Sequence, residues 1–183
     1  MEFINNDNDN DNDDGTVSDD GSIENIWVAA SDGNINAVKA LIESGTHVVN
    51  EQDNNGYSAI HAAASYGHEE LIRYLISNGA DVNLKDNDGD TPILLCEEPE
   101  IFTILKSYGA DPTAVNDLGQ GIFEKVVEDE NDVMIRFLVT EGIVDSERAE
   151  IALKQIDNII EEGDEGDDDD DDEEEGEGGM IVE

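Results

Sequence analysis

Residues 53–83 read DNNGYSAIHAAASYGHEELIRYLISNGADVN, and this stretch decides the fold of the 183-residue chain. Ile60, Ala63 and Ala64 have the spacing of one apolar face of a short helix, and the apolar residues between Leu71 and Ile76 recur at helical spacing on a second. Neither helix can bury its apolar face within a single unit, so neighbouring units must stack. The stretch therefore predicts an all-α repeat solenoid.

Glycine spacing shows that the unit is repeated along the chain. Intervals of 34, 30 and 33 residues separate four glycines, which are Gly45, Gly79, Gly109 and Gly142. Gly79 falls where the second helix should end, and Asn55 and Gly56 suit the turn of a projecting hairpin. A second hairpin glycine, Gly89, follows Gly56 by 33 residues. The chain is therefore expected to hold about four units of some 33 residues.

The unit resembles the ankyrin repeat, whose pattern is D-x-x-G-x-T-P-L-H-x-A-A, then G-H, an apolar helix and G-A-D-x-N. Residues 53–85 match this pattern almost throughout, and residues 22–52 keep IWVAASDGNINAVKALIESG without a leading hairpin, as an amino-terminal capping repeat would. Residues 86–115 keep Thr-Pro and Gly-Ala-Asp but lack three residues between the helices. Residues 116–145 keep the spacing without the T-P-L-H residues, and residues 146–160 could form a closing helix. The resemblance implies an ankyrin-repeat stack, with β-hairpin loops, over about three quarters of the chain.

Charge divides the chain into three parts. Residues 1–24 carry nine acids and residues 161–183 carry fifteen, and neither segment has a Lys or Arg. Repulsion within such segments favours an extended chain, so both are predicted to be disordered acidic tails around a folded domain at residues 25–160. The formal net charge of −41 argues against direct binding of nucleic acid or anionic membranes, both of which normally need basic patches. A Lys/Arg-rich protein is the expected partner.

Other features of the sequence bear on the class of protein. The apolar runs are too short to cross a bilayer, and the first residues, MEFINNDNDN, have no secretory pattern. Cys96 is the single cysteine, so it can form no internal disulfide, and it is expected to be a buried core residue. We expect a monomer of the cytoplasm, the nucleus or both.

Candidate catalytic and metal-binding residues each have a structural interpretation. His61 and His68 match the T-P-L-H and G-H positions of the resemblance, which implies hydrogen bonds that join repeats, and His47 lies in a variable loop. The run DNDNDNDDG at residues 7–15 resembles a calcium loop, but Gly21 stands where a bidentate Glu is required. The chain has none of the common phosphate-binding or hydrolase motifs. We therefore expect no catalytic residues, no metal and no cofactor, and hence no enzyme.

A protein-binding surface is implied by the resemblance, because ankyrin folds bind partners through the concave face formed by hairpin tips and first helices. The positions that vary in the family pattern are the candidate contacts, namely Gln52, Asn54, Asn55, Tyr57, Ser65, Tyr66, Lys85, Asn87, Asp88, Asp90, Asp117, Gln120, Glu128 and Asp129. Tyr57 and Tyr66 among acids and amides would form a hot spot, since tyrosine gives contact area at low entropic cost and carboxylates accept arginine.

Two functional hypotheses remain open at this stage. The first is a non-enzymatic module that binds a basic client, with an escort or chaperone-like role for a ribosomal protein or a histone. This architecture resembles small acidic ankyrin-repeat proteins of fungi, among which is an escort of a ribosomal protein. The second is a regulatory adaptor or inhibitory subunit whose acidic tails serve only solubility.

Overall fold

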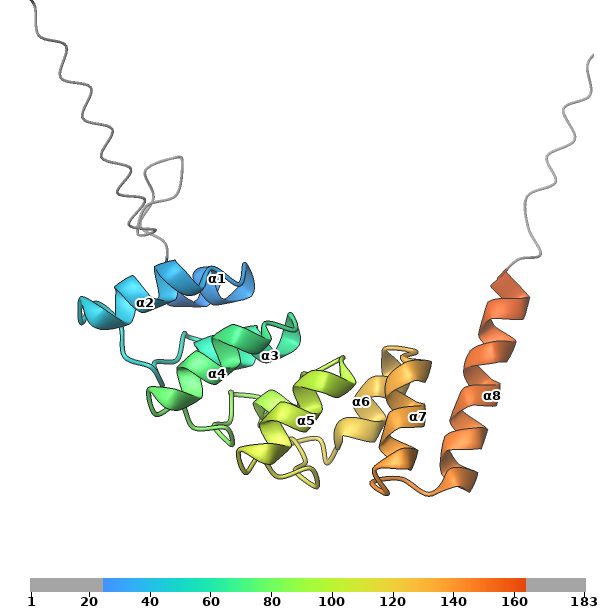
Figure 1. Cartoon of the computed structure of the whole chain (residues 1–183). Helices are drawn as coiled ribbons and strands as arrows, with labels where there is room; N and C mark the ends of the chain where they lie inside the picture. Colours follow the sequence, from blue (N-terminus) through green and yellow to red (C-terminus); the bar gives the residue numbers. More distant parts are fainter. Residues whose placement is uncertain (1–24, 164–183) are drawn as a thin grey trace, which may run out of the picture.

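The computed structural model describes residues 25–163, and their side chains as far as residue 156. Pairs of short helices follow one another along an arc that ends in the longer helix α8 (Figure 1). Their bounds are α1 Ile26–Ser31, α2 Ile35–Glu43, α3 Ala59–Ser65, α4 Glu69–Ser77, the 3₁₀ helix η1 Pro92–Leu94, α5 Pro99–Ser107, α6 Ile122–Glu128, α7 Asp132–Thr140 and α8 Ser146–Gly163. The described residues contain no strand longer than an isolated bridge, so the predicted all-helical stack is confirmed.

The helices form four antiparallel pairs and a closing helix. Each pair has a first helix (α1, α3, η1 or α6) and a second helix (α2, α4, α5 or α7). One continuous apolar core runs along the stack, because each pair buries its apolar face against its own partner helix and against the next pair. α8 covers the last pair by packing on α7, as expected for the closing helix, and it extends to Gly163 rather than residue 160.

Asn and Gly residues define where the helices begin and end. Asn34 and Asn131 cap α2 and α7 by accepting a backbone N–H with the side-chain oxygen. Gly79 follows α4 with φ of +92°, in the left-handed region predicted for a helix end. At the turn between first and second helices, Gly67 has φ of +73°, whereas the fourth repeat places Glu130 there with φ of +54°. Glu130 therefore occupies a backbone conformation that favours glycine.

Projecting hairpins, here called fingers, connect the repeats. They comprise residues 52–58, 85–91 and 115–121, and in each a backbone N–H donates across the turn to the carbonyl four residues later, as Asp53 does to Tyr57 at 2.9 Å. Neighbouring fingers are also joined by main-chain bonds. The Asn87 N–H donates to the Asn55 carbonyl at 2.9 Å, and the Asp117 N–H donates to the Asp88 carbonyl at 3.0 Å. The fingers thus form a continuous ladder along one edge of the stack.

The third repeat is short in its first helix rather than in the turn between its helices. The predicted loss of three residues is present, but the second helix, α5, keeps nine residues like its counterparts α4 and α7. The first helix contracts from seven residues in α3 to the single turn η1. Pro99 begins α5 and disfavours helical geometry at the residue before it, so only one turn fits between Thr91 and α5.

Two predictions fall on segments that the structure does not describe or only partly describes. The predicted disordered tails, residues 1–24 and 161–183, lie outside the described residues except for the end of α8, and so does the run at residues 7–15. Among the described residues, no helix is both long enough and apolar enough to span a membrane.

Candidate protein-binding surface

The finger tips bring together six of the predicted contact residues. Five are exposed at or beside the turns and lie on the ladder, namely Asn54, Asn55, Asn87, Asp88 and Asp117. The Asn87 amide donates to the Asn54 carbonyl at 2.9 Å, and the Gln52 amide crosses to the Lys85 carbonyl at 2.8 Å. These side chains therefore form one row along the finger edge, although Gln52 and Asn87 are already bound to neighbouring fingers.

The side chain that opens each finger, a carboxylate in two of them, holds the turn together and is not available to a partner. Asp53 Oδ1 accepts the backbone N–H groups of Asn55 and Tyr57, both at 2.8 Å, and Asp86 makes the same pair of bonds in the next finger. Asn116 replaces the aspartate in the fourth repeat and accepts from Leu118 and Gln120. The carboxylates that remain exposed on the fingers are those at the tips.

The two tyrosines have different environments. Tyr57 is half-buried and stacks on the His61 ring with centroids 5.4 Å apart, and burial raises the pKa of its hydroxyl. Tyr66 at the end of α3 is 61% exposed and lies over His68, with ring centroids 6.4 Å apart. Tyr66 is therefore the aromatic side chain available to a partner, and Tyr57 stabilises the junction between repeats.

Asp90 is not placed as predicted. The side chain was expected on the binding surface, but the residue is only 6% exposed and its Oδ2 lies 2.9 Å from Lys125 Nζ in the next repeat. In the described part of the chain, its second oxygen, Oδ1, has no hydrogen-bond partner. Buried charged groups in proteins are normally paired, and here Lys125 is the partner. Asp90 therefore ties the third repeat to the fourth and offers little surface to a client.

The remaining predicted contacts lie on the fingers, as Lys85 and Gln120 do, and at the ends of the first helices. Gln120 donates to Glu128 Oε1 at 2.6 Å, across one face of α6, and Lys85 Nζ donates to the Val115 carbonyl at 3.2 Å. Glu128 and Asp129 are exposed at the end of α6, and Ser65 is half-buried at the end of α3. Like Tyr66, the side chains of Ser65, Glu128 and Asp129 therefore lie at the ends of first helices.

His61 is a structural residue, as the sequence indicated. It is fully buried, its Nδ1 lies 2.7 Å from Ser58 Oγ, and its Nε2 lies 3.0 Å from the Leu84 carbonyl and 3.3 Å from the Asp90 carbonyl. The contact to Asp90 joins the second repeat to the third. Burial lowers its pKa, because the charged imidazolium would lose hydration. In the third repeat Leu94 takes the position of His61, which leaves Thr91 Oγ1 buried and without a partner among the described residues.

The other candidate reactive residues are structural as well. His68 Nε2 lies 2.7 Å from the Ser31 carbonyl and so joins α4 to the first repeat. Cys96 is buried and its Sγ donates to the Ile93 carbonyl, and burial raises the pKa of its thiol to about 12. Residues 25–156 hold no group of three or more His, Cys, Asp or Glu side chains able to bind a metal ion.

Glu124 has a role that the sequence reading missed. It stands in the fourth repeat where His61 stands in the second, and its Oε2 accepts the Gly121 N–H at 2.9 Å. Its other oxygen pairs with Arg148 of α8, whose guanidinium lies 4.5 Å from the centre of the Phe123 ring. In the fourth repeat the carboxylate of Glu124 thus replaces the imidazole and joins the repeat to α8. Aligning the repeats position by position would have revealed this substitution.

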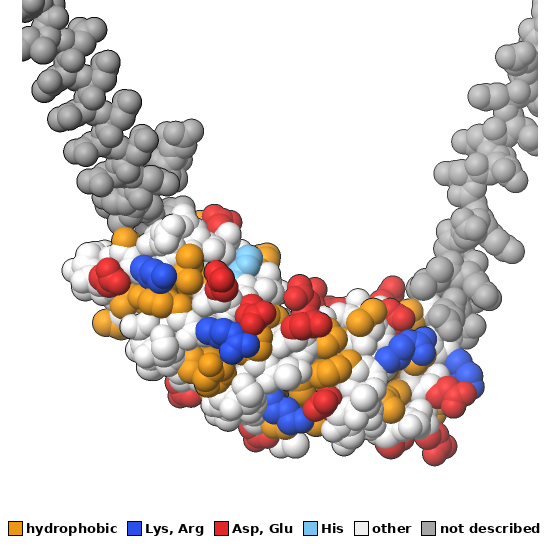
Figure 2. Space-filling model, viewed as in Figure 1, with side chains coloured by type: hydrophobic (Ala, Val, Ile, Leu, Met, Phe, Trp, Pro, Cys, Tyr) orange, Lys and Arg blue, Asp and Glu red, His pale blue; other side chains and the backbone are white. Residues whose placement is uncertain are grey.

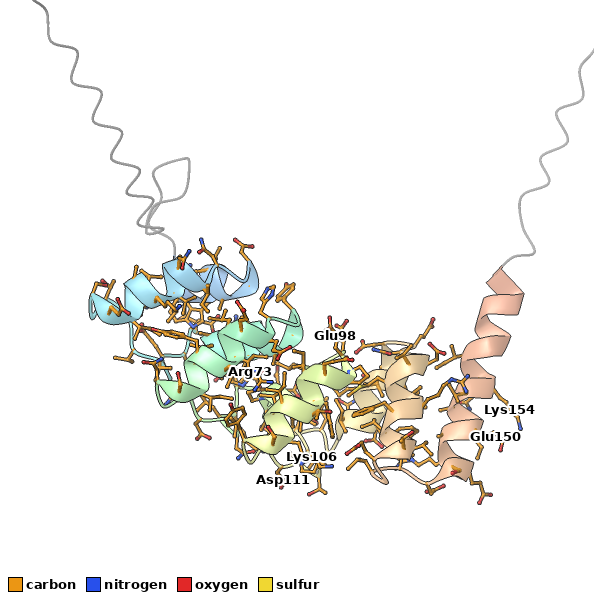
Figure 3. All side chains as sticks on the ribbon, in the orientation of Figure 1. Arg73, Glu98, Lys106, Asp111, Glu150 and Lys154 are labelled. Atoms are coloured by element: carbon orange, nitrogen blue, oxygen red, sulfur yellow. The ribbon has the colours of Figure 1, made fainter. Side chains whose placement is uncertain are left out.

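Charges differ between the two sides of the stack. Three of the four second helices pair a basic residue with an acid, as in Arg73–Glu69, Arg136–Asp132 and Lys106–Glu141. Figure 2 shows acidic, basic and apolar side chains interspersed on the face that carries these helices. Glu98 before α5 and Asp111 after it lie at opposite edges of that face (Figure 3). This side of the molecule therefore carries several ion pairs, while other exposed acids on it, such as Glu70 and Glu100, form none in the described structure.

The side formed by the fingers and first helices has fewer cations. It carries Lys85 and Lys125, whose amines are bound to the Val115 carbonyl and to Asp90. In the part of the chain whose side chains are described, no Lys or Arg forms an ion pair with its exposed acids, which include Asp88, Asp117, Glu97, Glu128 and Asp129. The sequence reading missed Glu97, and it also missed Leu118, which is 82% exposed at the tip of the fourth finger.

Comparison with known proteins agrees with the geometry. A family model for ankyrin repeats, described as three copies, matches residues 26–116. An ankyrin repeat-containing protein of Schizosaccharomyces pombe is 46% identical over 96 residues, which span 52% of this chain and 46% of that protein.

Two mammalian proteins are also similar to this chain. Human BCL-6 corepressor-like protein 1 is 34% identical over 113 residues, which span 60% of this chain and 6% of that protein. Mouse protein phosphatase 1 regulatory subunit 27 is 39% identical over 64 residues, which span 35% of this chain and 41% of its own. The chain therefore spans less than half the length of each of these relatives.

Proposed function

Because residues 26–116 are ankyrin repeats and the described chain folds as one ankyrin stack, we propose that this protein is a non-enzymatic module that binds a Lys/Arg-rich protein. Ankyrin repeats generally mediate protein–protein interaction, and no catalytic family is indicated by the comparisons. The binding surface in this proposal is the side formed by the fingers and the first helices. An escort role for a ribosomal protein or a histone fits such a module, acting as a monomer in the cytoplasm, the nucleus or both.

The observation that carries the proposal is the distribution of unpaired charge. All eight basic residues of the chain lie in the described segment, and each is already engaged. Six form ion pairs, Lys85 binds a carbonyl, and Lys39 lies over the Tyr74 ring with its amine 5.2 Å from the ring centre. The exposed carboxylates on the finger side have no such partners, so a basic client would supply the missing charge.

A capture experiment at two salt concentrations tests the proposal. The full-length chain and residues 25–163 are used as baits at about 0.15 M salt and at several-fold higher salt, where exposed charges are screened. Retention of one basic protein in stoichiometric amount by the full chain, weakened by salt, supports the proposal. Removal of the acidic segments should weaken that retention further if they take part in capture.

The alternative function is a regulatory adaptor or inhibitory subunit. The observation that favours it is the similarity to a protein named as a regulatory subunit of protein phosphatase 1. In this case the same non-basic partner would be retained by both baits and would survive high salt, because the contacts would be apolar and specific to the folded surface. That outcome would contradict the proposal of a basic client.

A further inference from the structure

The row of first helices is interrupted at the third repeat. α3 and α6 have seven residues each, whereas η1 between them has three. A hollow of about 160 Å³ lies beyond the end of η1. It is lined from three sides, by Ser65 of α3, by residues 94–97, and by Lys125, Val126, Glu128 and Asp129 of α6 and its end.

The hollow has an apolar base and an acidic rim. Leu94, Cys96 and Val126 are at most 2% exposed and form the base. Carboxylates line the exposed edge, contributed by Glu97 before α5 and by Glu128 and Asp129 at the end of α6. The cation in the lining, Lys125, has its charge compensated by Asp90 at 2.9 Å. The lining therefore keeps a surplus of negative charge facing solvent.

We propose that this hollow receives one arginine side chain of the basic partner, an inference that rests on the proposed function. Pockets for small molecules have volumes of roughly 300–1,000 Å³, so the hollow suits a single side chain rather than a cofactor or metabolite. The methylenes of an arginine would lie on Leu95 and Val126, and its planar guanidinium would reach two carboxylates at once. A purely apolar side chain would leave those carboxylates without a counter-charge.

The test uses the full-length protein and a defined probe, N-acetyl-arginine amide, followed by NMR shifts of backbone amides. N-acetyl-citrulline amide, which has nearly the same shape but no charge, is the matched control probe. We expect saturable shifts at residues 94–97 and 125–129 with a Kd in the millimolar range, and much smaller shifts with citrulline. The double variant Glu97→Gln and Glu128→Gln should raise the Kd about fivefold, as expected from two exposed ion pairs.

A matched variant distinguishes the hollow from general electrostatic attraction. Glu70→Gln with Glu100→Gln removes the same charge from exposed positions on α4 and α5, and the Kd should stay unchanged. Shifts spread evenly over the acidic surface, equal binding of citrulline, or equal effects of the two double variants would overturn the inference. If the probe fails in this way while the full chain still retains a basic protein in the capture experiment, the proposed function stands without the hollow. Specific binding of the probe without a retained basic protein would overturn the proposed function instead.

Discussion

Replacing His61 by leucine should uncouple the second repeat from the third. The substitution keeps a side chain of similar size in a fully buried position, and the third repeat already carries a leucine, Leu94, at the equivalent place. The change removes the partner of the Ser58 hydroxyl and of the Leu84 carbonyl, and it removes a 3.3 Å contact to the Asp90 carbonyl. The variant therefore isolates the effect of the hydrogen bonds from that of packing.

The expected loss follows from the polar groups left behind. Each buried donor or acceptor without a partner costs about 1–3 kcal/mol, and three groups lose theirs, namely the Ser58 N–H, the Ser58 hydroxyl and the Leu84 carbonyl. The added leucine carbons return about 1 kcal/mol by burial. The net destabilisation should be about 3 kcal/mol, a large part of the roughly 5–15 kcal/mol that stabilises a typical domain.

Urea unfolding, followed by circular dichroism and by the fluorescence of Trp27 in α1, measures this loss. The control is Thr91→Val, which removes a buried hydroxyl that has no partner in the described structure and adds a methyl group. Its stability should be unchanged or higher, within about 0.5 kcal/mol of wild type or above it. A loss below about 1 kcal/mol for His61→Leu, or an equal loss for the control, would refute the assignment of this network as the tie between repeats.

Three further predictions follow from individual residues. Burial lowers the pKa of His61 in the folded protein, so as pH falls through about 6.5 the unfolded chain takes up a proton before the folded chain does. Acid therefore favours unfolding of the wild type but not of His61→Leu. The difference in free energy of unfolding between the two proteins should shrink from pH 7.5 to about pH 5. A difference that is constant in urea titrations across this range would contradict that pKa. Glu130→Gly should stabilise the protein by about 1 kcal/mol because φ at this position is +54°. The control Asp129→Gly should destabilise it, because φ there is −85°. Thermal unfolding of both variants measures the two changes, and a lower melting temperature for Glu130→Gly would contradict the prediction. Cys96 should react with a thiol reagent only after unfolding, since it is buried with a pKa of about 12, and rapid labelling of the native protein would show that the position opens.

The repeated architecture could be predicted from sequence because it rests on local signals. Glycine spacing and the apolar faces of residues 53–83 are enough to define a unit and its stacking. Which helix shortens in the third repeat could not be read in the same way, because spacing counts residues without saying which segment loses them. α5 keeps its full length because Ile101, Phe102 and Leu105 fill the core, and the contraction falls on η1.

The place of each candidate contact residue in its repeat could be predicted from the sequence, but the exposure of its side chain could not. Exposed tips such as Asn55 and Asp88 follow from their place in the repeat. The burial of Asp90 could not be predicted, because its cationic partner, Lys125, lies 35 residues away in the sequence and no local pattern marks the pair. Tyr57 exposes less surface than a tip residue because it is half-buried and its ring stacks on His61. Side-chain pairs between residues far apart in the sequence therefore could not be predicted.

The ladder between fingers has a consequence for how this protein can change over evolution or be engineered. Its bonds join main-chain atoms, from Asn87 to Asn55 and from Asp117 to Asp88, so the tip side chains can be exchanged without breaking it. The glycines Gly56 and Gly89 are the exception, since a Cβ there would come within 2.7 Å and 2.5 Å of the next finger. Substitutions of the tip side chains can therefore change binding specificity while the main-chain ladder and the two glycines stay the same.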